Sequence, residues 1–336
     1  SIKEKHSFLQ FIKKYVWPFR KEMMQLSFGM LSGILLSLVA PFLTQAMVDS
    51  GIAMRDMDVI RREIVDADAV LVRIIELPGS LLATAKNLKI VSKHGVGYDN
   101  IDLDYCKSHG VAVTITPNAN SLSVAEHAFT LMLTLAKNII PVSNEYRTVG
   151  FAAKNHAPGI EMTGKTLGLI GMGRIGKHIL HMCRDGLDMH VIVYDPYISE
   201  VPEGVEKVDD LSELLRRADV VTLHCLLTDE TRKLIDRERL ALMKPTALLI
   251  NCARGPIVDE AALIEALENG RLAGAGLDVT DPEPVAPDSP LFKLPNVIVT
   301  PHYAPTTVES ATRVSKIAAE NINAVLAGQE PVGRIV

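Results

Sequence analysis

Short runs of aliphatic and β-branched residues recur at nearly regular intervals along the second half of the chain. Such continuous apolar runs are typical of strands that are buried on both faces of a parallel sheet. Helical patterns lie between them at 211–218 and 260–270, and the second ends in Gly270 as a C-cap signal. This alternation predicts an α/β fold with a doubly wound parallel sheet. The predicted strands are TLGLI (166–170), HVIVYD (190–195), VVTLHCL (220–226), ALLINCA (247–253), AGAGLDV (273–279) and NVIVTPH (296–302).

The first of these runs leads into a glycine-rich turn, Gly171-Met-Gly173-Arg174-Ile175-Gly176, followed by a helical pattern. A βαβ unit with G-x-G-x-x-G at its first turn predicts a dinucleotide site of the Rossmann type. The first glycine permits the tight turn, the second lets the backbone approach the pyrophosphate, and the third lets helix and strand pack closely. The pyrophosphate then meets the free N–H groups at the helix N-terminus.

Asp195 ends the second strand of this unit, at the position where an acidic residue accepts hydrogen bonds from the adenosine ribose. A carboxylate there would repel a 2′-phosphate, which predicts NAD rather than NADP as the cofactor.

Three further strand ends carry groups suited to hydride transfer next to a hydroxyl or keto carbon: Arg254, Glu283 and His302. Ligands of such sheets bind beyond the carboxyl ends of the strands. His302 can act as the acid/base, Glu283 can orient it and favour the imidazolium, and Arg254 can grip a substrate carboxylate. Taken singly, these residues also fit a capping histidine, a loop charge and a surface ion pair.

The bulk composition narrows the class of partner. The chain has 336 residues and a net charge of -5, so it lacks the excess of basic residues that is typical of nucleic-acid-binding proteins. Four cysteines (Cys106, Cys183, Cys225 and Cys252) lack the close spacing of a zinc site or a CxxC motif and indicate free thiols in a reducing compartment. We expect no metal site.

The first 55 residues follow another pattern. Residues 23–48 contain no charged side chain, a run long enough to cross a bilayer as a helix, and six basic residues precede it. The stretch FIKKYVWPFRKEMMQLSFGMLSGILLSLVAPFLTQAMVDSGI resembles the first transmembrane helix of exporter-type ABC transporters, although no ATP-binding motif occurs. A crossing with the N-terminus inside would place the dinucleotide site outside the cell. We therefore expect this segment to be foreign to the enzyme, as in a composite chain, with membrane association only if residues 23–48 insert.

From about residue 60 the chain resembles the D-isomer-specific 2-hydroxyacid dehydrogenases, the family of phosphoglycerate dehydrogenases and hydroxypyruvate or glyoxylate reductases. The resemblance rests on six motifs: HGVGYDNID (94–102), NSLSVAEH (120–127), GKTLGLIGMGRIGK (164–177), NCARGPIVDE (251–260), LDVTDPEP (277–284) and TPHYA (300–304). It implies a cytoplasmic, NAD-dependent oxidoreductase acting on a small D-2-hydroxy or 2-keto acid, such as hydroxypyruvate, glyoxylate or a 3-phosphoglycerate-like compound.

The resemblance also implies roles for single residues. It places Arg254, Glu283 and His302 in the active site and the backbone of Val96 and Gly97 at the substrate carboxylate. It assigns Asp278 to the nicotinamide carboxamide and adds Cys252 to the cofactor site formed by the glycine motif and Asp195. It further implies a homodimer, with the segment NSLSVAEHAFTLMLTLAKN packing across the two-fold axis.

Two departures from the family pattern stand out. Leu226 replaces the proline usual in the H-x-P-L-T turn, and Tyr303 follows the histidine where a smaller residue is common.

At the N-terminal end of the chain, the apolar segment stands where family members have two strands and a helix, so we expect a truncated flavodoxin-like substrate domain. The predicted domains are 1–55 (hydrophobic segment), 118–305 (NAD-binding) and 56–117 with 306–336 (substrate).

Two alternatives to the enzyme remain from the sequence. One is a membrane-anchored protein that only senses NAD(H), favoured by the uncharged run. The other is a corepressor-like protein that keeps the fold for binding without turnover.

Overall fold

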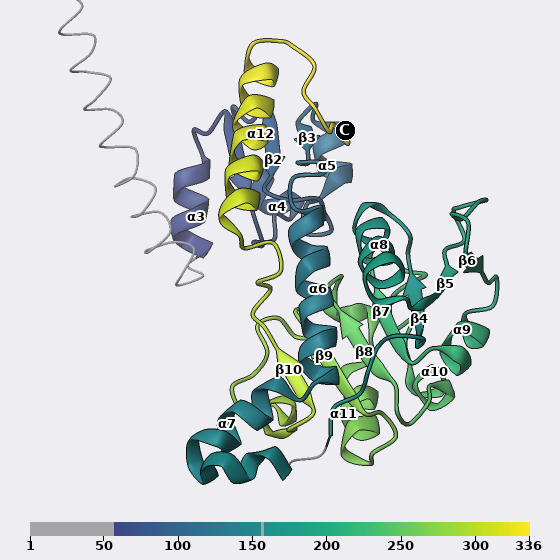
Figure 1. Cartoon of the computed structure of the whole chain (residues 1–336). Helices are drawn as coiled ribbons and strands as arrows, with labels where there is room; N and C mark the ends of the chain where they lie inside the picture. Colours follow the sequence, from purple (N-terminus) through teal and green to yellow (C-terminus); the bar gives the residue numbers. More distant parts are fainter. Residues whose placement is uncertain (1–56, 156–157) are drawn as a thin grey trace, which may run out of the picture. The chain divides into compact units, whose positions relative to one another are not determined.

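The computed structural model describes residues 57–155 and 158–336 (Figure 1). The hydrophobic helix expected in residues 1–55, and with it the exporter resemblance, lies outside the described residues. Within the described ranges no helix is both long and apolar enough to cross a membrane. The chain divides into two compact units, and the described part of the smaller one comprises residues 57–68 and 79–88.

The smaller unit contributes helix α3 (Met57–Ile64) and the single turn α4 (Gly79–Leu82). The Lys86 N–H donates to the Val65 carbonyl at 3.2 Å, which joins the two segments of this unit.

A seven-stranded parallel sheet forms the centre of the larger unit, in the order β10-β9-β8-β7-β4-β5-β6. Chain order reverses between β4 and β7, the switch point at which doubly wound sheets bind ligands. The strands are β4 (Thr166–Ile170), β5 (His190–Tyr194), β6 (Val205–Lys207), β7 (Val220–Leu223), β8 (Leu248–Asn251), β9 (Gly274–Leu277) and β10 (Val297–Val299).

Both faces of this sheet are covered, because its apolar residues alternate between two buried clusters. Leu167 and Leu169 of β4 point to the face packed by α6 and α8, whereas Ile170 joins the face packed by α9, α10 and α11. Gly276 of β9 lets α6 approach closely, since a Cβ there would lie 3.0 Å from that of Leu131. The helices are α6 (Ser121–Ala136), α8 (Arg174–Leu187), α9 (Leu211–Arg217), α10 (Arg237–Leu242) and α11 (Glu260–Glu268).

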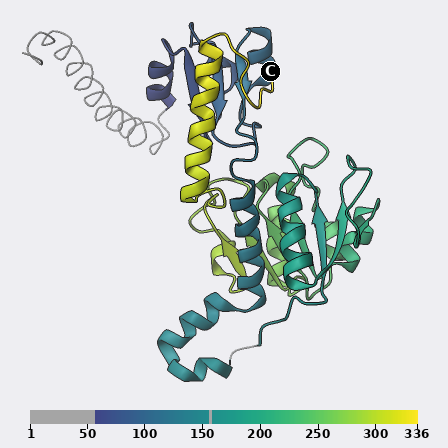
Figure 2. The same cartoon turned by 45° about the horizontal axis from the view of Figure 1, so that its top comes forward.

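A second, three-stranded parallel sheet has the order β1-β2-β3, formed by β1 (Ala69–Val72), β2 (Ile90–Lys93) and β3 (Ala112–Thr114). Helix α5 (Leu103–Ser108) connects β2 to β3. Helix α12 (Val308–Leu326) packs on β2 and β3, as both views show (Figures 1 and 2). The last residues of the chain pair antiparallel with β3.

In a flavodoxin-like sheet of strand order 2-1-3-4-5, the last three strands are parallel neighbours in sequence order. Strands β1, β2 and β3 have the same arrangement. The described residues contain no strand for the first half of such a sheet. The expected domain boundaries at 117 and 305 stay a prediction.

Three features depart from the sequence prediction. The strands β7, β8 and β9 end up to three residues earlier than the apolar runs, so that His224, Cys252 and Asp278 follow strand ends. Strand β6 was not predicted, because its sequence VEK is short, polar and at the sheet edge. An arm formed by α7 (Ile139–Val149) and the 3₁₀ helix η4 (Gly150–Asn155) also carried no predicted element. Among the described residues, two further 3₁₀ turns are η5 (Gly255–Ile257) and η6 (Pro290–Lys293).

Candidate active site

The glycine loop lies at the switch point of the seven-stranded sheet, between β4 and α8. Gly171 has φ +90° and touches the next strand end, since a Cβ there would meet the His224 and Cys225 backbone at 2.8 Å. A Cβ on Gly176 would lie 2.3 Å from the Gly171 carbonyl oxygen, whereas Gly173 faces open space. The N-terminus of the 14-residue helix α8 follows, with Arg174 exposed and Ile175 half-buried in its first turn. The backbone therefore fits a bound pyrophosphate.

Asp195, directly after β5, is tied to this loop. Its carboxylate accepts the Met172 N–H at 2.9 Å and the Tyr197 N–H at 3.0 Å. These bonds hold the carboxylate at the edge of the glycine loop, the place where the sequence predicts the ribose contact.

His302 and Glu283 form the second part of the site. The Nδ1 of His302 lies 2.7 Å from Oε1 of Glu283, and both side chains remain partly exposed. An imidazole that donates Nδ1–H to a carboxylate keeps Nε2 for a reacting group. The structure thus brings together two residues that are 19 positions apart in the sequence.

The loop that carries Glu283 is anchored on helix α11. Glu260 accepts the Asp281 N–H at 2.9 Å, and burial raises the pKa of the Glu260 carboxyl. Gly255 lies directly against the same loop, because a Cβ there would be 1.9 Å from the Thr280 carbonyl oxygen. These two contacts support the part of the loop just before Glu283, whose carboxylate lies beside His302.

Arg254 follows β8 and packs against the loop after β2. Its Nε donates to both carboxylate oxygens of Asp99, at 3.0 and 3.2 Å. The guanidinium lies over Gly97, where a Cβ would stand 1.6 Å from Nη2, so only glycine permits this arrangement. Buried Asn251 shapes the Arg254 loop by donating to the Arg254 carbonyl and accepting the Ala253 N–H. Arg254 and the Val96–Gly97 backbone are thereby neighbours.

The two remaining cofactor candidates are buried beside these loops. Asp278 is 1% exposed, and its carboxylate accepts the Thr300 hydroxyl and the N–H groups of Tyr303 and Ala304. Cys252 directly follows β8, and burial raises the pKa of its thiol. All four cysteines are free, and the described residues offer no group of side chains suited to a metal ion.

Several neighbours of the site were not singled out from the sequence. Asp99 and His127 lie inside quoted motifs but had no assigned role, and Glu260 follows the predicted Arg254 strand end. Their partners are 155, 173 and 21 positions away, respectively. Their position inside these motifs was the one feature of the sequence that could have pointed to them.

A glycine loop at the switch point of a doubly wound parallel sheet, with a histidine–carboxylate pair at neighbouring strand ends, defines a dinucleotide-binding protein of the Rossmann class. Residues 129–304 match the family model described as "D-isomer specific 2-hydroxyacid dehydrogenase, NAD binding domain". The chain belongs to this family, as its motifs predicted.

Curated relatives and solved structures agree with this membership. The chain is 45% identical over 271 residues to a D-3-phosphoglycerate dehydrogenase of Methanocaldococcus jannaschii, covering 80% of this chain and 51% of the relative. It is 40% identical to a glyoxylate reductase of Thermofilum pendens, covering 80% of this chain and 81% of the relative. A D-lactate dehydrogenase of Aquifex aeolicus complexed with NAD and lactic acid superposes with a TM-score of 0.74 at 34% identity, over 80% of this chain and 85% of that one. The chain spans about half the length of the phosphoglycerate dehydrogenases it matches.

His224 generates a prediction about stability and pH. Its Nε2 lies 2.9 Å from the Thr222 hydroxyl, its Nδ1 is buried without a partner in the described structure, and burial lowers the pKa of His224 from 6.5 to about 3. Between these two pH values the unfolded chain binds a proton at this residue that the folded chain does not. Stability therefore falls as the pH falls through this window, by up to about 1.4 kcal/mol per pH unit.

We expect His224→Asn to remove this dependence. Urea unfolding at pH 7 and pH 5 should show a loss for the parent chain that exceeds the loss for His224→Asn by up to about 2 kcal/mol. The exposed His178 provides a control, since His178→Gln should keep the parental pH dependence. Equal pH dependence in the parent and His224→Asn would show that His224 titrates normally in the folded chain.

Proposed function

We propose that the protein is an NAD-dependent oxidoreductase that interconverts a small D-2-hydroxy acid and its 2-keto acid. The observation that carries the proposal is the 2.7 Å contact between His302 and Glu283 beside a dinucleotide-binding loop. A protein that only binds NAD(H), whether anchored or corepressor-like, has no need of an acid/base pair. Asp195 favours NAD over NADP, and Cys252 and Asp278 complete the proposed cofactor site.

The residues divide the work between binding and proton transfer. A nicotinamide bound at the glycine loop would supply or accept the hydride at the substrate C2. Arg254 and the backbone of Val96 and Gly97 hold the substrate carboxylate, and Asp99 fixes the guanidinium through two hydrogen bonds. In the reducing direction, His302 in its imidazolium form donates a proton to the keto oxygen. In the oxidising direction, neutral His302 accepts the hydroxyl proton, and Glu283 stabilises the resulting charge.

The first test is NADH oxidation by the purified full chain with glyoxylate, pyruvate, hydroxypyruvate and phosphohydroxypyruvate. His302→Asn should lower kcat by about 100-fold or more while NADH binding, followed by its fluorescence, is unchanged. Undiminished turnover in His302→Asn would remove His302 from the mechanism. NADH binding without turnover of any keto acid by the parent chain would favour the corepressor-like alternative.

The charge around the substrate loop favours a substrate with a second anionic group. Arg73, after β1, is exposed, and its Nη2 donates to the Thr306 hydroxyl at 3.3 Å, just past the His302 turn. Lys93 donates to the Arg73 carbonyl and to Asn100. Burial and the nearby Arg254 lower the pKa of Lys93 to about 8, and burial and Arg73 lower that of His94.

The cations of this group are Arg73, Lys93 and Arg254, because the lowered pKa of His94 leaves its imidazole neutral at pH 7. Asp99 supplies the opposing charge and is engaged by Arg254. A substrate with two anionic groups, such as a phosphorylated 2-keto acid, would offset more of the repulsion among these cations than a substrate with one anionic group. Arg254 then binds the carboxylate and Arg73 the second group. We therefore propose a 3-phosphoglycerate-like substrate rather than glyoxylate.

Arg73→Gln separates these substrates. It should raise KM for phosphohydroxypyruvate about 10-fold, the effect of losing one hydrogen bond to a charged group, and leave KM for glyoxylate within about 2-fold. Lys316→Gln on α12 removes the same charge from an exposed side chain and should change neither KM. An equal rise for both substrates, or glyoxylate as the better parental substrate, would contradict the second anion site and leave the dehydrogenase assignment intact.

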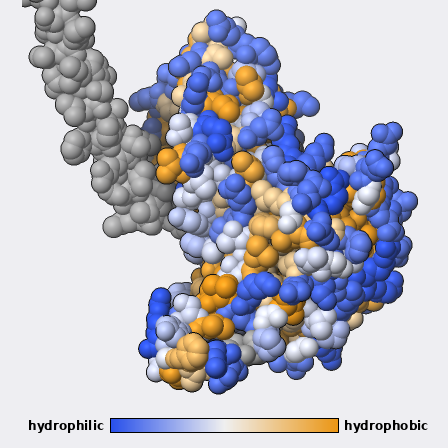
Figure 3. Space-filling view, viewed as in Figure 1, coloured by the Kyte–Doolittle hydropathy of each residue, from blue (hydrophilic) through white to orange (hydrophobic). Residues whose placement is uncertain are grey.

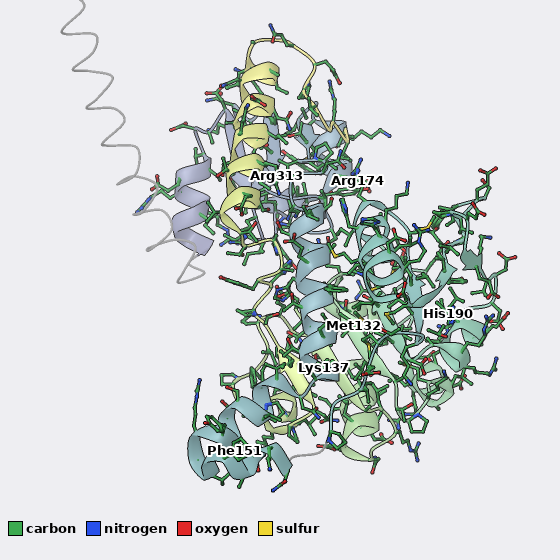
Figure 4. The ribbon with its side chains drawn as sticks, viewed as in Figure 1. Met132, Lys137, Phe151, Arg174, His190 and Arg313 are labelled. Atoms are coloured by element: carbon green, nitrogen blue, oxygen red, sulfur yellow. The ribbon has the colours of Figure 1, made fainter. Side chains whose placement is uncertain are left out.

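We also propose that the enzyme is a homodimer, and that the α7–η4 arm contributes to the interface together with α6. Helix α7 has no buried residue, and the arm exposes several large apolar side chains. Figure 3 shows hydrophobic surface over this arm, and Figure 4 places Phe151 there. The exposed residues of the arm are Ile139, Ile140, Tyr146, Val149 and Phe151. Single exposed apolar side chains are normal on a protein surface, but several on one arm indicate a contact surface.

Sedimentation velocity tests the dimer. The parent chain should sediment at twice the chain mass, and the double variant Ile140→Glu with Phe151→Glu at the mass of one chain, because the added charges oppose burial of the arm. Val332→Glu, an equally exposed apolar site elsewhere, should stay dimeric. A monomeric parent chain would overturn the proposal.

A further inference from the structure

The turn that contains His302 is held by a buried carboxylate. Asp278 receives three hydrogen bonds from this turn: from the Thr300 hydroxyl at 2.6 Å, the Tyr303 N–H at 2.7 Å and the Ala304 N–H at 2.9 Å. The His302 N–H donates to the Asp278 carbonyl at 2.8 Å. One residue at the end of β9 thus determines the course of the backbone on both sides of His302.

This turn needs such support because His302 adopts a left-handed conformation, with φ at +51°. A residue with a side chain occupies that region only where surrounding contacts impose it. If the bonds to Asp278 loosened, the backbone of His302 would relax and its imidazole would leave the Glu283 carboxylate. The placement of the acid/base therefore depends on groups that do not touch the substrate.

A histidine on another element completes this network. His127 of α6 places its Nε2 at 3.0 Å from the Thr300 hydroxyl oxygen and at 3.5 Å from Oδ1 of Asp278. The single hydroxyl proton of Thr300 is used in the 2.6 Å bond to the carboxylate. The contact with His127 can then form only if His127 donates, which requires a proton on Nε2.

We propose that His127 is a positioning residue for His302. It donates from Nε2 to Thr300, orients the Thr300 hydroxyl toward Asp278, and thereby holds the His302 turn on helix α6. Because α6 packs on β8 and β9, the turn is connected to an element that is itself fixed by the core. This inference rests on the proposed function, since it takes His302 as the acid/base.

Two pairs of variants test the path through Thr300. His127→Leu removes the donor at similar volume, whereas His127→Gln retains an N–H at a position close to Nε2. Thr300→Val removes the hydroxyl, and Thr300→Ser retains it. His127→Leu and Thr300→Val should each lower kcat about 10-fold, as expected for a displaced reacting group, with KM for the keto acid and NADH affinity within about 2-fold.

The conservative variants should recover most of this loss. The double variant His127→Leu with Thr300→Val should be no slower than either single variant, because both changes break one path. His181→Leu on α8, whose side chain is 74% exposed, should leave kcat at the parental value. Parental kcat in His127→Leu, no recovery in His127→Gln, or losses that multiply in the double variant would each overturn the inference.

Histidine side-chain NMR tests the same inference without turnover. In the parent chain, His127 should be protonated at Nε2, and the His302 ring resonances should move in His127→Leu but remain in place in His127→Gln. Unchanged His302 resonances in His127→Leu would overturn the positioning role even if no keto acid is reduced. Lack of turnover in a parent chain that shows the expected shifts would instead reject the proposed function alone.

Discussion

The parallel pairing of the seven central strands is the constraint on which the rest of the structure depends. Because all seven run in the same direction, their carboxyl ends meet at one edge of the sheet, and the residues that follow those ends become neighbours. Gly171, Asp195, Arg254, Asp278 and His302 all follow a strand of this sheet. Burial of both sheet faces by helices makes the register rigid, since a slip of one residue would exchange the two apolar clusters.

Around this edge, each side chain proposed to react or to bind substrate is held by other residues that have no proposed chemical role. Glu260 and Gly255 position the loop of Glu283, Asp99 and Asn251 position Arg254, and Asp278 holds the turn of His302. Two of the supporting residues are far more buried than those they support: Asn251 and Asp278 are 1% exposed, whereas the Arg254 and His302 side chains are 26% and 27% exposed. This division suits a site whose outer residues must meet a soluble substrate while its geometry stays constant.

Electrostatics distinguishes the two ends of the site. At the glycine loop the positive end of α8 and open backbone suit a pyrophosphate, and Asp195 is the acidic residue beside it. At the proposed substrate loop the cations Arg73, Lys93 and Arg254 gather with Asp99 as the opposing charge. Burial and the neighbouring cations lower the pKa of Lys93 and of His94. The proposed dinucleotide site therefore lies at the strand ends of the seven-stranded sheet, whereas the proposed anionic-substrate site gathers residues from β1 and β2 of the three-stranded sheet around Arg254.

The sequence alone determined the class of fold, the glycine loop, and the strands from β4 to β10 except β6. A parallel strand that is buried on both faces has a continuous apolar run, which can be recognised in the sequence without the structure. It also supplied Arg254, Glu283 and His302 as candidates, since each follows such a run. Strand β6 left no signal, being short, polar and at the edge. The sequence suggested Glu283 as the partner of His302, and the tertiary structure gave the contact between them. Only the tertiary structure laid Arg254 on Gly97 and linked His127 to Thr300. These are contacts between distant segments, and no local pattern encodes a partner that the packing of helices on the sheet brings into reach.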